Sequence, residues 1–295
     1  MKIKLGKNGK KGLRNEGKTD LKGVNFTGNI DKIFDIPLFS KEERQVLKIL
    51  GKNLDLGTKK YWVATVNPEF VMMAQKDEKF KRLLFKTNLN VIDGIGLVWA
   101  HQLDDRYKVL DARKKNKISK FLLGFKIGVE VLRGKYKDQV ASGADLILKL
   151  SKMVKEKNKK IFLLGGWDNR AEKTVNFLKS GFGFSDKQIT WCKGEPGVSK
   201  KEVIKAVNDF KPDVLLVAYG MRKQEFWIND NLSKLDVGIV IGVGRSFDYY
   251  SGELKRAPGW LRKMGLEWFY SLMMEPSRFK RQLVLPKFVW KVLTD

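Results

Sequence analysis

Cysteine and histidine are almost absent from this sequence. Its 295 residues include one cysteine, Cys192, and one histidine, His101. A single cysteine cannot form an intramolecular disulfide or a cysteine-based metal site, so the chain lacks the mark of a disulfide-stapled secreted domain and fits a reducing compartment. A single histidine excludes sites with two histidine ligands and restricts any histidine-dependent triad to His101. We therefore expect acid–base chemistry to rest on carboxylates.

Long hydrophobic runs are also missing. A membrane-spanning helix needs about 20 largely apolar residues, whereas the most apolar segments, 121–132 and 237–243, are shorter or interrupted by charge. The N-terminal residues carry positive charges with no apolar stretch behind them, so we expect no export signal. The chain is not expected to span a bilayer.

Simple nucleotide-binding motifs are absent as well. The sequence contains no GxxxxGK[ST] loop, and Gly242-Val243-Gly244 lacks the third glycine of the dinucleotide fingerprint. Glycines at strand ends still allow backbone N–H groups to approach a diphosphate. A nucleotide site of another kind therefore stays open.

Positive charge is abundant. Lys and Arg number 59 against 33 Asp and Glu, which gives a net charge of +26. Such an excess favours a polyanionic partner, either nucleic acid, an anionic membrane surface or a phosphorylated ligand. With 43% hydrophobic residues the chain can bury one large core or two modest ones, so wholesale disorder is excluded.

Short apolar strands alternate with amphipathic helices along the middle of the chain. A first helix is expected after Ser40 as N-cap, and a second opens at Pro68. The predicted strands span residues 61–66, 89–92, 160–164, 213–218 and 237–243. This alternation predicts an α/β fold, a Rossmann-like, mostly parallel sheet flanked by helices, with ligands beyond the carboxyl ends of the strands.

Two basic regions interrupt or follow this pattern. Residues 104–139 carry eleven Lys or Arg against five acids around an apolar centre, and residues 251–295 mix aromatic residues with arginine. We divide the chain into a basic, flexible arm (1–37), a catalytic domain (38–250) with the 104–139 insertion, and a C-terminal appendage (251–295). Each basic region either faces an anionic membrane or packs on the core with a solvated basic face.

Several spaced motifs together resemble the WecG/TagA/CpsF family of bacterial glycosyltransferases over residues 60–285. The earlier ones are Thr65-Val66-Asn67, Ile92-Asp93-Gly94-Ile95-Gly96, Gly143-Ala144-Asp145-Leu146, Leu164-Gly165-Gly166 and Lys211-Pro212-Asp213. The later ones are Gly220 with Lys223-Gln224-Glu225-Phe226-Trp227-Ile228, Gly242-Val243-Gly244 with Phe247-Asp248, Gly252, Arg256-Ala257-Pro258, Gly265-Leu266-Glu267-Trp268, and Glu275-Pro276 with Arg278 and Arg281.

The resemblance implies a metal-independent, inverting transferase with a Rossmann-like fold. Such enzymes move an N-acetylated hexosamine, N-acetylmannosamine or its uronic acid, from a UDP-sugar donor to a polyprenyl-diphosphate-linked acceptor. They work in cell-surface polysaccharide synthesis, including teichoic acid of the cell wall. The resemblance further implies a peripheral protein on the cytoplasmic, inner face of the cell membrane and favours a homo-oligomer.

The catalytic residues implied by the resemblance are Asp93, Thr65 and Asn67. Asp93 matches the family's proposed base and would need a pKa raised toward neutrality by partial burial. The alternative for Asp93 is a simple helix cap. Thr65 and Asn67 match sugar or acceptor contacts, and their alternative, a turn that caps the helix after Pro68, is compatible with that role.

A second set is implied to bind the donor. It comprises Gln224, Gly94, Gly96, Gly165, Gly220, Gly244, Arg245 and Asp248. Gln224 is expected to hydrogen-bond the donor, with Glu225 as its support, while the alternative is an exposed first helical turn. Asp248 is expected near the uridine or ribose, although an Asp at such a junction also serves turns.

Arginines of the appendage are implied to bind the acceptor diphosphate at the membrane. They are Arg256, Arg278 and Arg281. Arg278 and Arg281 lie three residues apart, hence on one helical face, from which two guanidinium groups can clamp a diphosphate. The alternative is a pair of solvated surface arginines.

The sequence departs from the family pattern at several positions. Val140 replaces the usual Arg, Arg222 replaces Pro, Arg245 replaces a small residue and Ser271 replaces an expected Arg. Arg245 is therefore a candidate either to replace the charge missing at Val140 or to bind a carboxylated donor sugar.

Three rival functions remain open. The first is a transferase for a glucosyl or uronosyl nucleotide, and the second is a scaffold that has lost catalysis. The third is a nucleic-acid-binding protein, which predicts steeply salt-dependent binding and no transfer. The ordered glycine and acid motifs argue against that third reading, and we expect no nucleic acid as partner.

Overall fold

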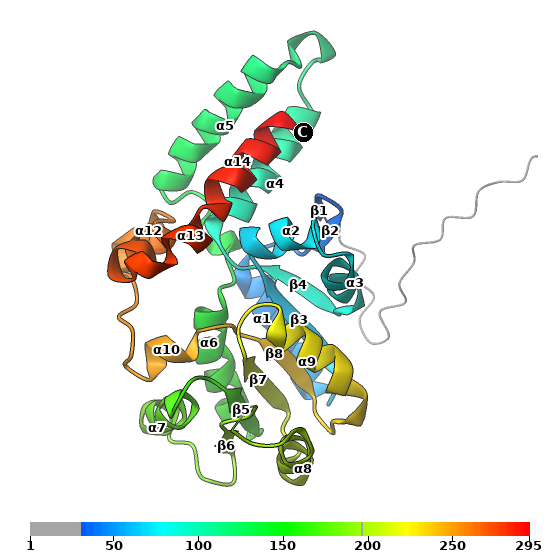
Figure 1. The fold of residues 1–295 in the computed structure, drawn as a ribbon, viewed down its shortest axis with the longest axis vertical. Coiled ribbons are helices and arrows are strands. Elements are labelled where there is room, and N and C mark those ends of the chain that lie inside the picture. The colour runs from blue at the N-terminus through cyan, green and yellow to red at the C-terminus, as the bar shows by residue number, and fades with distance from the viewer. Residues whose placement is uncertain (1–30, 196) are drawn as a thin grey trace, which may run out of the picture.

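Six parallel strands form one sheet at the centre of the protein (Figure 1). The computed structural model describes residues 31–195 and 197–295, so residues 1–30 of the predicted basic arm lie outside the described residues. The strand order is β4-β3-β8-β7-β5-β6, and every pairing is parallel. The strands are β3 (Tyr61–Val66), β4 (Leu89–Ile92), β5 (Ile161–Gly165), β6 (Ile189–Cys192), β7 (Val214–Ala218) and β8 (Ile239–Gly242). The predicted α/β class is confirmed.

Side-chain alternation along the strands separates two cores. In β3, Trp62 and Ala64 face one core, whereas Tyr61 and Val63 face the other. The first face is covered by α2 (Pro68–Ala74), α3 (Glu78–Lys86), α4 (Ile95–Lys108), α8 (Lys200–Phe210) and α9 (Lys223–Asn231). The second face is covered by α1 (Glu43–Asp55), α6 (Gly143–Glu156), α7 (Arg170–Phe182) and α10 (Phe247–Tyr250).

The neighbouring strands β3 and β8 lead to opposite faces of the sheet. From β3 the chain enters α2 on the first face, and from β8 it enters α10 on the second. The two connections diverge at the carboxyl edge, which opens the crevice where α/β sheets bind ligands.

A β-hairpin occupies part of the region assigned to the basic arm. It comprises β1 (Asp31–Ile33) and β2 (Ile36–Leu38), and it packs Ile33, Ile36 and Leu38 into the first core. The boundary predicted at residue 37 was therefore too late, because these three apolar side chains draw the segment onto the sheet.

The first helix is present, but its predicted cap is wrong. Helix α1 begins at Glu43, with Glu42 as the N-cap residue and no side-chain capping bond. The Ser40 hydroxyl instead donates a hydrogen bond to the Asp31 carboxylate of the hairpin.

The 104–139 insertion and the C-terminal segment form one helical arm (Figure 1). The helical arm consists of α4, α5 (Lys117–Leu132) and α14 (Val284–Thr294), which pack on one another. Phe288 of α14 is fully buried. A Cβ atom at Gly124 of α5 would lie 3.0 Å from Leu293 and 3.2 Å from Trp99, so the absence of a side chain lets the three helices approach. Segments about 150 residues apart thus share a core.

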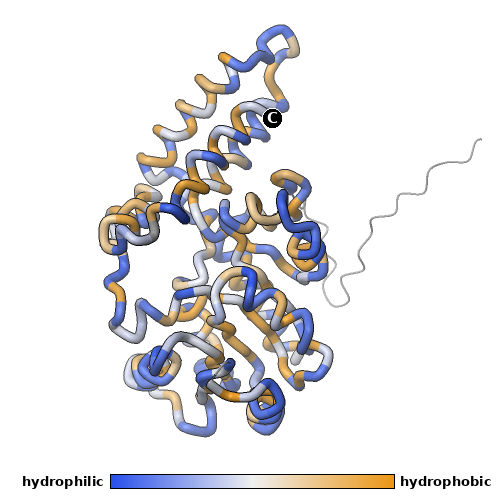
Figure 2. Tube along the Cα trace, in the orientation of Figure 1, coloured by the Kyte–Doolittle hydropathy of each residue, from blue (hydrophilic) through white to orange (hydrophobic). Residues whose placement is uncertain are grey.

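Short elements complete the chain. They are α11 (Gly259–Lys263), α12 (Glu267–Met274), α13 (Phe279–Gln282) and the 3-10 turns η1 (Ala112–Lys114), η2 (Lys137–Gln139), η3 (Leu232–Lys234) and η4 (Pro276–Arg278). Polar and apolar residues intermingle along the helices (Figure 2), and no described helix is long and apolar enough to cross a membrane.

Candidate active site

Two cavities meet at the carboxyl edge of the sheet. The first cavity, about 270 Å³, is lined by residues that include Thr65, Asn67, Gly220, Gln224, Gly244 and Arg245. The second cavity, about 440 Å³, is lined by residues that include Gly96, Lys137, Val140, Lys149, Arg262 and Lys263. Both cavities are bordered by Asp93, Gly94, Ser142, Glu267 and Trp268. Asp93 therefore lies at their junction.

Asp93 is held by main-chain contacts after β4. Its own N–H donates to the Val66 carbonyl at 2.7 Å, and its carboxylate accepts a hydrogen bond from the Gly143 N–H. Gly94 then turns the chain with φ of 125°, which a residue without Cβ adopts most readily. Helix α4 has Gly94 at its N-cap and no side-chain capping bond, so Asp93 is not the helix cap that the alternative reading required.

The surroundings of Asp93 favour its neutral form. Burial raises the pKa of Asp93 to about 7, and the nearby carboxylates of Glu267 and Asp145 act in the same direction. The Arg256 guanidinium and the Gly143 N–H partly oppose this rise in pKa. A carboxyl group with this pKa takes up and releases protons near neutral pH, as a general base requires.

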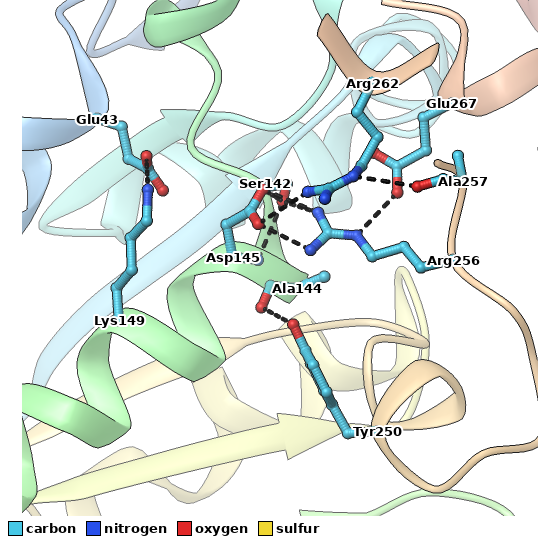
Figure 3. A network of polar contacts seen from close by, with 10 residues as sticks. All are labelled: Glu43, Ser142, Ala144, Asp145, Lys149, Tyr250, Arg256, Ala257, Arg262 and Glu267. Atoms are coloured by element: carbon cyan, nitrogen blue, oxygen red, sulfur yellow. Dashed lines mark hydrogen bonds and ion pairs between the residues drawn. The ribbon is translucent and has the colours of Figure 1, made fainter. Parts of the chain in front are cut away.

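The charged groups that act on Asp93 belong to a network of polar contacts around Arg256 (Figure 3). The Arg256 guanidinium donates to both carboxylate oxygens of Asp145, at 2.7 and 2.8 Å, and to Glu267 at 3.1 Å. Burial works against the charge of Arg256, but the Asp145 and Glu267 carboxylates raise its pKa above the ordinary value. Arg256 borders neither cavity. Its donors thus serve internal carboxylates, in contrast to the acceptor role that the resemblance implied.

Thr65 and Asn67 border the first cavity. The Thr65 hydroxyl donates to the Gly242 carbonyl at 2.9 Å, which ties the ends of β3 and β8 together. The Asn67 side-chain oxygen accepts from the Phe70 N–H at 3.2 Å and caps α2. No hydrogen bond within the described residues uses the Asn67 amide N–H₂, which leaves this group for a ligand.

The Gln224 amide is held in one orientation. Its nitrogen donates to Glu225 at 2.7 Å, and its oxygen accepts from the Gly244 N–H at 2.9 Å. The other Glu225 oxygen accepts from the Arg222 N–H at 2.7 Å. Glu225 is fully buried, and burial raises its pKa to about 7. The exposed helical turn considered for this pair is therefore wrong, and Glu225 supports Gln224 as expected.

The glycines predicted to bind the donor do not all border the same cavity. Gly94, Gly220 and Gly244 border the first cavity, and Gly96 borders the second. Gly165 borders neither. A Cβ atom on Gly165 would lie 2.8 Å from the Tyr219 ring, so this position serves close packing between strand ends.

Arg245 and Asp248 form a cluster at the rim of the first cavity. Asp248 is 2% exposed, and its two oxygens accept from Arg170 at 2.6 Å and Arg245 at 2.7 Å. Asp248 does not border the cavity, whereas Arg245 does, and Arg245 also pairs with Glu275. Because Val140 borders the second cavity, Arg245 does not stand in for the charge missing at Val140.

The appendage reaches the first cavity through Arg281. Its guanidinium donates to both oxygens of Glu69, each at 2.6 Å, and so joins α13 to α2. Arg281 borders the first cavity, and its predicted contact with the acceptor diphosphate stays a prediction. The side chain of Arg278 lies outside the described part of the chain.

His101 takes part in a separate cluster. Its Nε2 lies 2.8 Å from Asp31 and its Nδ1 lies 3.2 Å from Asp105. In the described residues this is the one group of His, Cys, Asp or Glu with metal-ligand spacing. This cluster lines neither the first nor the second cavity. The contact of His101 with Asp31 joins the hairpin to α4, and Asp105 lies on α4 itself.

Sequence reasoning missed several residues at the junction. Ser142, Glu267 and Trp268 border both cavities, and Lys137 and Lys263 border the second. Glu267 and Trp268 lay within a quoted family motif but received no role there. The two lysines had no sequence signal, because lysine is common throughout this chain and only the fold brings these two together.

The arrangement fits a transfer between two bound molecules. A base at the junction of two cavities can take the proton from a hydroxyl bound in one cavity. The hydroxyl oxygen then lies close to a reacting carbon bound in the other. Arg245 and Arg281 supply positive charge at the first cavity, and Lys137 and Lys263 supply it at the second. Two anionic substrates are thus accommodated.

Comparisons with known proteins agree with this geometry. Enzymes called N-acetylglucosaminyldiphosphoundecaprenol N-acetyl-beta-D-mannosaminyltransferase are similar to the chain. The protein of Bacillus subtilis (strain 168) is 29% identical over 79% of each chain, and that of Bacillus spizizenii (strain W23) is 27% identical over 79% of this chain and 78% of its own. The protein of Staphylococcus aureus (strain MW2) is 25% identical over 94% of this chain and 93% of its own. A profile described as "Glycosyl transferase WecG/TagA/CpsF family" matches residues 32–116 and 123–295, and the chain therefore belongs to this family of glycosyltransferases.

Proposed function

We propose that this enzyme transfers N-acetylmannosamine from a UDP-sugar to a polyprenyl-diphosphate-linked N-acetylglucosamine, with inversion at the anomeric carbon. The observation that carries the proposal is the place of Asp93, at the junction of two cavities and with a pKa raised to about 7. The names of the similar enzymes supply the sugar and the acceptor.

The Asp93 carboxylate takes the proton from the acceptor hydroxyl. The hydroxyl oxygen then forms a bond to the anomeric carbon of the donor sugar, on the side opposite UDP. The bond between that carbon and the UDP oxygen breaks, and UDP leaves with the electron pair. Attack from the opposite side inverts the anomeric configuration.

The first cavity is our candidate for the donor. Gly220 and Gly244 at its wall present backbone without side chains, which suits close approach of a diphosphate. Arg245 and Arg281 are placed to stabilise the charge that develops on the departing UDP. We therefore propose that these guanidinium groups serve the leaving diphosphate and that no metal ion is required.

The second cavity is our candidate for the acceptor diphosphate. Lys137 and Lys263 border it, and neither forms an ion pair within the described residues. Arg262 borders it as well and shares its charge with Asp145 at 3.6 Å. In this proposal Lys137, Lys263 and Arg262 take the place of Arg256 in the acceptor site.

A polyprenyl acceptor requires the site to work at a membrane. The appendage exposes apolar side chains close to Arg262 and Arg281, namely Trp260 (62% exposed), Phe269 (45%), Met273 (65%) and Phe279 (57%). Aromatic rings beside cations suit the headgroup region of an anionic bilayer. We propose a peripheral position on the cytoplasmic face.

The test is release of UDP from UDP-N-acetylmannosamine in the presence of a lipid-linked N-acetylglucosamine. We expect kcat/KM of the parent to rise with pH through about 7, since the base must be deprotonated. Asp93→Asn should lower turnover by about 10²- to 10⁴-fold. The control is Asp209→Asn, which removes an exposed carboxylate paired with Lys205. Near-normal turnover of Asp93→Asn would refute the assignment of the base.

The identity of the donor sugar is the open alternative. Arg245 at the first cavity also suits a carboxylated donor, such as a uronosyl nucleotide. A thermal-shift screen over N-acetylmannosaminyl, glucosyl and uronosyl nucleotides separates these donors, because a bound ligand raises the melting temperature.

A further inference from the structure

Helix α5 carries an apolar stripe on the side that faces away from the rest of the helical arm. Its inner residues, Gly124, Ile127 and Val131, are buried. Its outer residues Ile118, Phe121, Leu122 and Phe125 are 73%, 58%, 60% and 69% exposed. These four follow the spacing i, i+3, i+4 and i+7, so they form one continuous face. We call them the α5 stripe.

Positive charge predominates along the segment that carries the α5 stripe. Residues 112–129 contain six Lys or Arg and no Asp or Glu. The cations are Arg113, Lys114, Lys115, Lys117, Lys120 and Lys126. An apolar helical face flanked by cations is typical of segments that lie in the interface of an anionic bilayer.

The charge also argues against a second copy of the chain as the occupant. A symmetric contact through the α5 stripe would bring two sets of six cations together with no acid within 112–129 to offset them. An anionic lipid surface, in contrast, offers both the apolar layer and the opposite charge. No described helix can span a bilayer, so contact is confined to the interface.

Most of the α5 stripe lies outside the match to the family profile. The family profile matches residues 32–116 and 123–295 and passes over residues 117–122. The residues passed over include Ile118, Phe121 and Leu122, which are most of the stripe. The motifs shared with the family therefore do not account for it.

We propose that the α5 stripe docks on an anionic membrane, as a second contact besides the C-terminal appendage. Helix α5 packs on α4 and α14. Helix α4 begins directly after Asp93 and Gly94, and η2 after α5 carries Lys137 of the second cavity. Docking of α5 would thus fix the distance between the bilayer and the acceptor cavity. This role in catalysis rests on the proposed function, whereas membrane binding by α5 can be tested without it.

The experiment compares two double variants of the full chain on vesicles. Phe121→Gln/Phe125→Gln removes the two aromatic rings of the stripe. Leu56→Gln/Phe85→Gln is the matched control. Leu56 (61% exposed) lies at the end of α1 and Phe85 (44% exposed) lies on α3, so neither belongs to the stripe. Binding is measured by co-sedimentation with phosphatidylcholine vesicles that contain or lack phosphatidylglycerol. Circular dichroism verifies that each variant is folded.

We expect the parent and the control to bind anionic vesicles alike and neutral vesicles much more weakly. The stripe variant should bind anionic vesicles on the order of tenfold more weakly, because two exposed rings no longer enter the interface. Its kcat/KM with a water-soluble, short-chain acceptor should match that of the parent.

Two results would overturn the docking surface. One is equal vesicle binding by the stripe variant and the parent. The other is a parent dimer, seen by sedimentation velocity, that the stripe variant dissociates without any change in vesicle binding. If no donor supports UDP release while stripe-dependent binding persists, the proposed function fails and the docking surface stands.

Discussion

The surroundings that suit Asp93 to the proposed role of base also lower the stability of the folded protein. A carboxylate at the junction of two cavities, near Glu267 and Asp145, is poorly solvated and repelled by like charges. The same surroundings that raise its pKa to about 7 make its charged form costly to the folded state. Such a cost is typical of sites that are organised for reaction rather than for stability.

This conflict predicts that Asp93→Asn is more stable than the parent above neutral pH. In the unfolded chain Asp93 ionises near pH 3.8, whereas in the folded chain it ionises near 7. The parent therefore loses stability as pH rises between these values, and the loss is complete above about pH 7. We expect Asp93→Asn to gain about 1–3 kcal/mol at pH 8, after allowance for partial solvation of the carboxyl group. The gain should vanish near pH 4.

Urea unfolding at pH 4 and pH 8 measures this difference. Asp209→Asn is again the comparison, because its exposed carboxylate should change stability little at either pH. An Asp93→Asn protein that is less stable than the parent at pH 8 would contradict the raised pKa.

At the scale of elements, the ion pair between Arg281 and Glu69 joins the appendage to the catalytic domain at the first cavity. Arg281 of α13 and Glu69 of α2 are 43% and 17% exposed at their side chains and meet with bidentate geometry. Glu69 lies two residues after Asn67, so the contact closes over the residues that border the cavity. An anionic substrate would have to compete with Glu69 for the Arg281 guanidinium.

If Arg281 leaves Glu69 to bind an anionic substrate, substitutions of Arg281 and of Glu69 should have opposite effects on KM. Arg281→Ala should raise KM for the UDP-sugar donor by about ten- to a hundredfold, since a charge-assisted contact to the donor diphosphate is lost. Glu69→Gln should leave that KM unchanged or lower it, because it frees Arg281. Both variants should melt close to the parent, as partly exposed ion pairs contribute about 0–1 kcal/mol.

Steady-state kinetics with varied concentration of the UDP-sugar donor measure these effects. Arg44→Ala serves as the control, because Arg44 is 79% exposed and pairs with Glu42 away from both cavities. An equal rise of KM in Arg281→Ala and Glu69→Gln would mean that the pair only braces the appendage.

At the scale of the whole molecule, the helical arm and the sheet share one core. Phe288 of α14 is fully buried and meets Phe34 of the hairpin edge-on, with ring centroids 6.3 Å apart. Helix α14 also packs on α2, α4 and α5. The C-terminal helix is therefore part of the catalytic domain's hydrophobic core, and removal of the whole segment would disturb more than a membrane contact.

We predict that Phe288→Ala destabilises the entire protein in a single transition. Loss of a fully buried phenylalanine costs about 3–5 kcal/mol. Trp290→Ala, two residues further on the same helix, removes a side chain that is 71% exposed and should change stability by less than about 0.5 kcal/mol. Calorimetry of both variants measures the change in stability and the number of unfolding transitions. A separate low-temperature transition for Phe288→Ala would show that the arm unfolds by itself.

Much of the fold was predictable from local patterns. The strands at 61–66 and 89–92 agree with β3 and β4 to the residue, and those at 160–164, 213–218 and 237–243 agree within one or two residues. Strand β6 (Ile189–Cys192) was missed, because it lies at the sheet edge and three of its four residues are only half-buried. The hairpin was missed because its two strands have three residues each, too few for a visible alternation.

The site was predictable as a set of residues but not as an arrangement. The motifs identified Asp93, Asn67 and Gln224, which the fold brings to one cavity. They could not separate Arg245 and Arg281, which border that cavity, from Arg256, which is engaged by Asp145 and Glu267. Arginines look alike in a sequence. All three pair with carboxylates, and only the fold determines that Arg245 and Arg281 border the cavity and Arg256 does not.

The sequence by itself determined the class of fold, the family and the carboxylate that we propose as the base. Strand and helix periodicity, glycines at strand ends and the scarcity of histidine and cysteine are local properties of the chain. Tertiary structure alone decided that Asp93 separates two cavities, that Glu225 is buried behind Gln224, and that the insertion and the C-terminus form one arm. Those facts depend on contacts between segments far apart along the chain, where burial and opposite charge, not local pattern, select the partners.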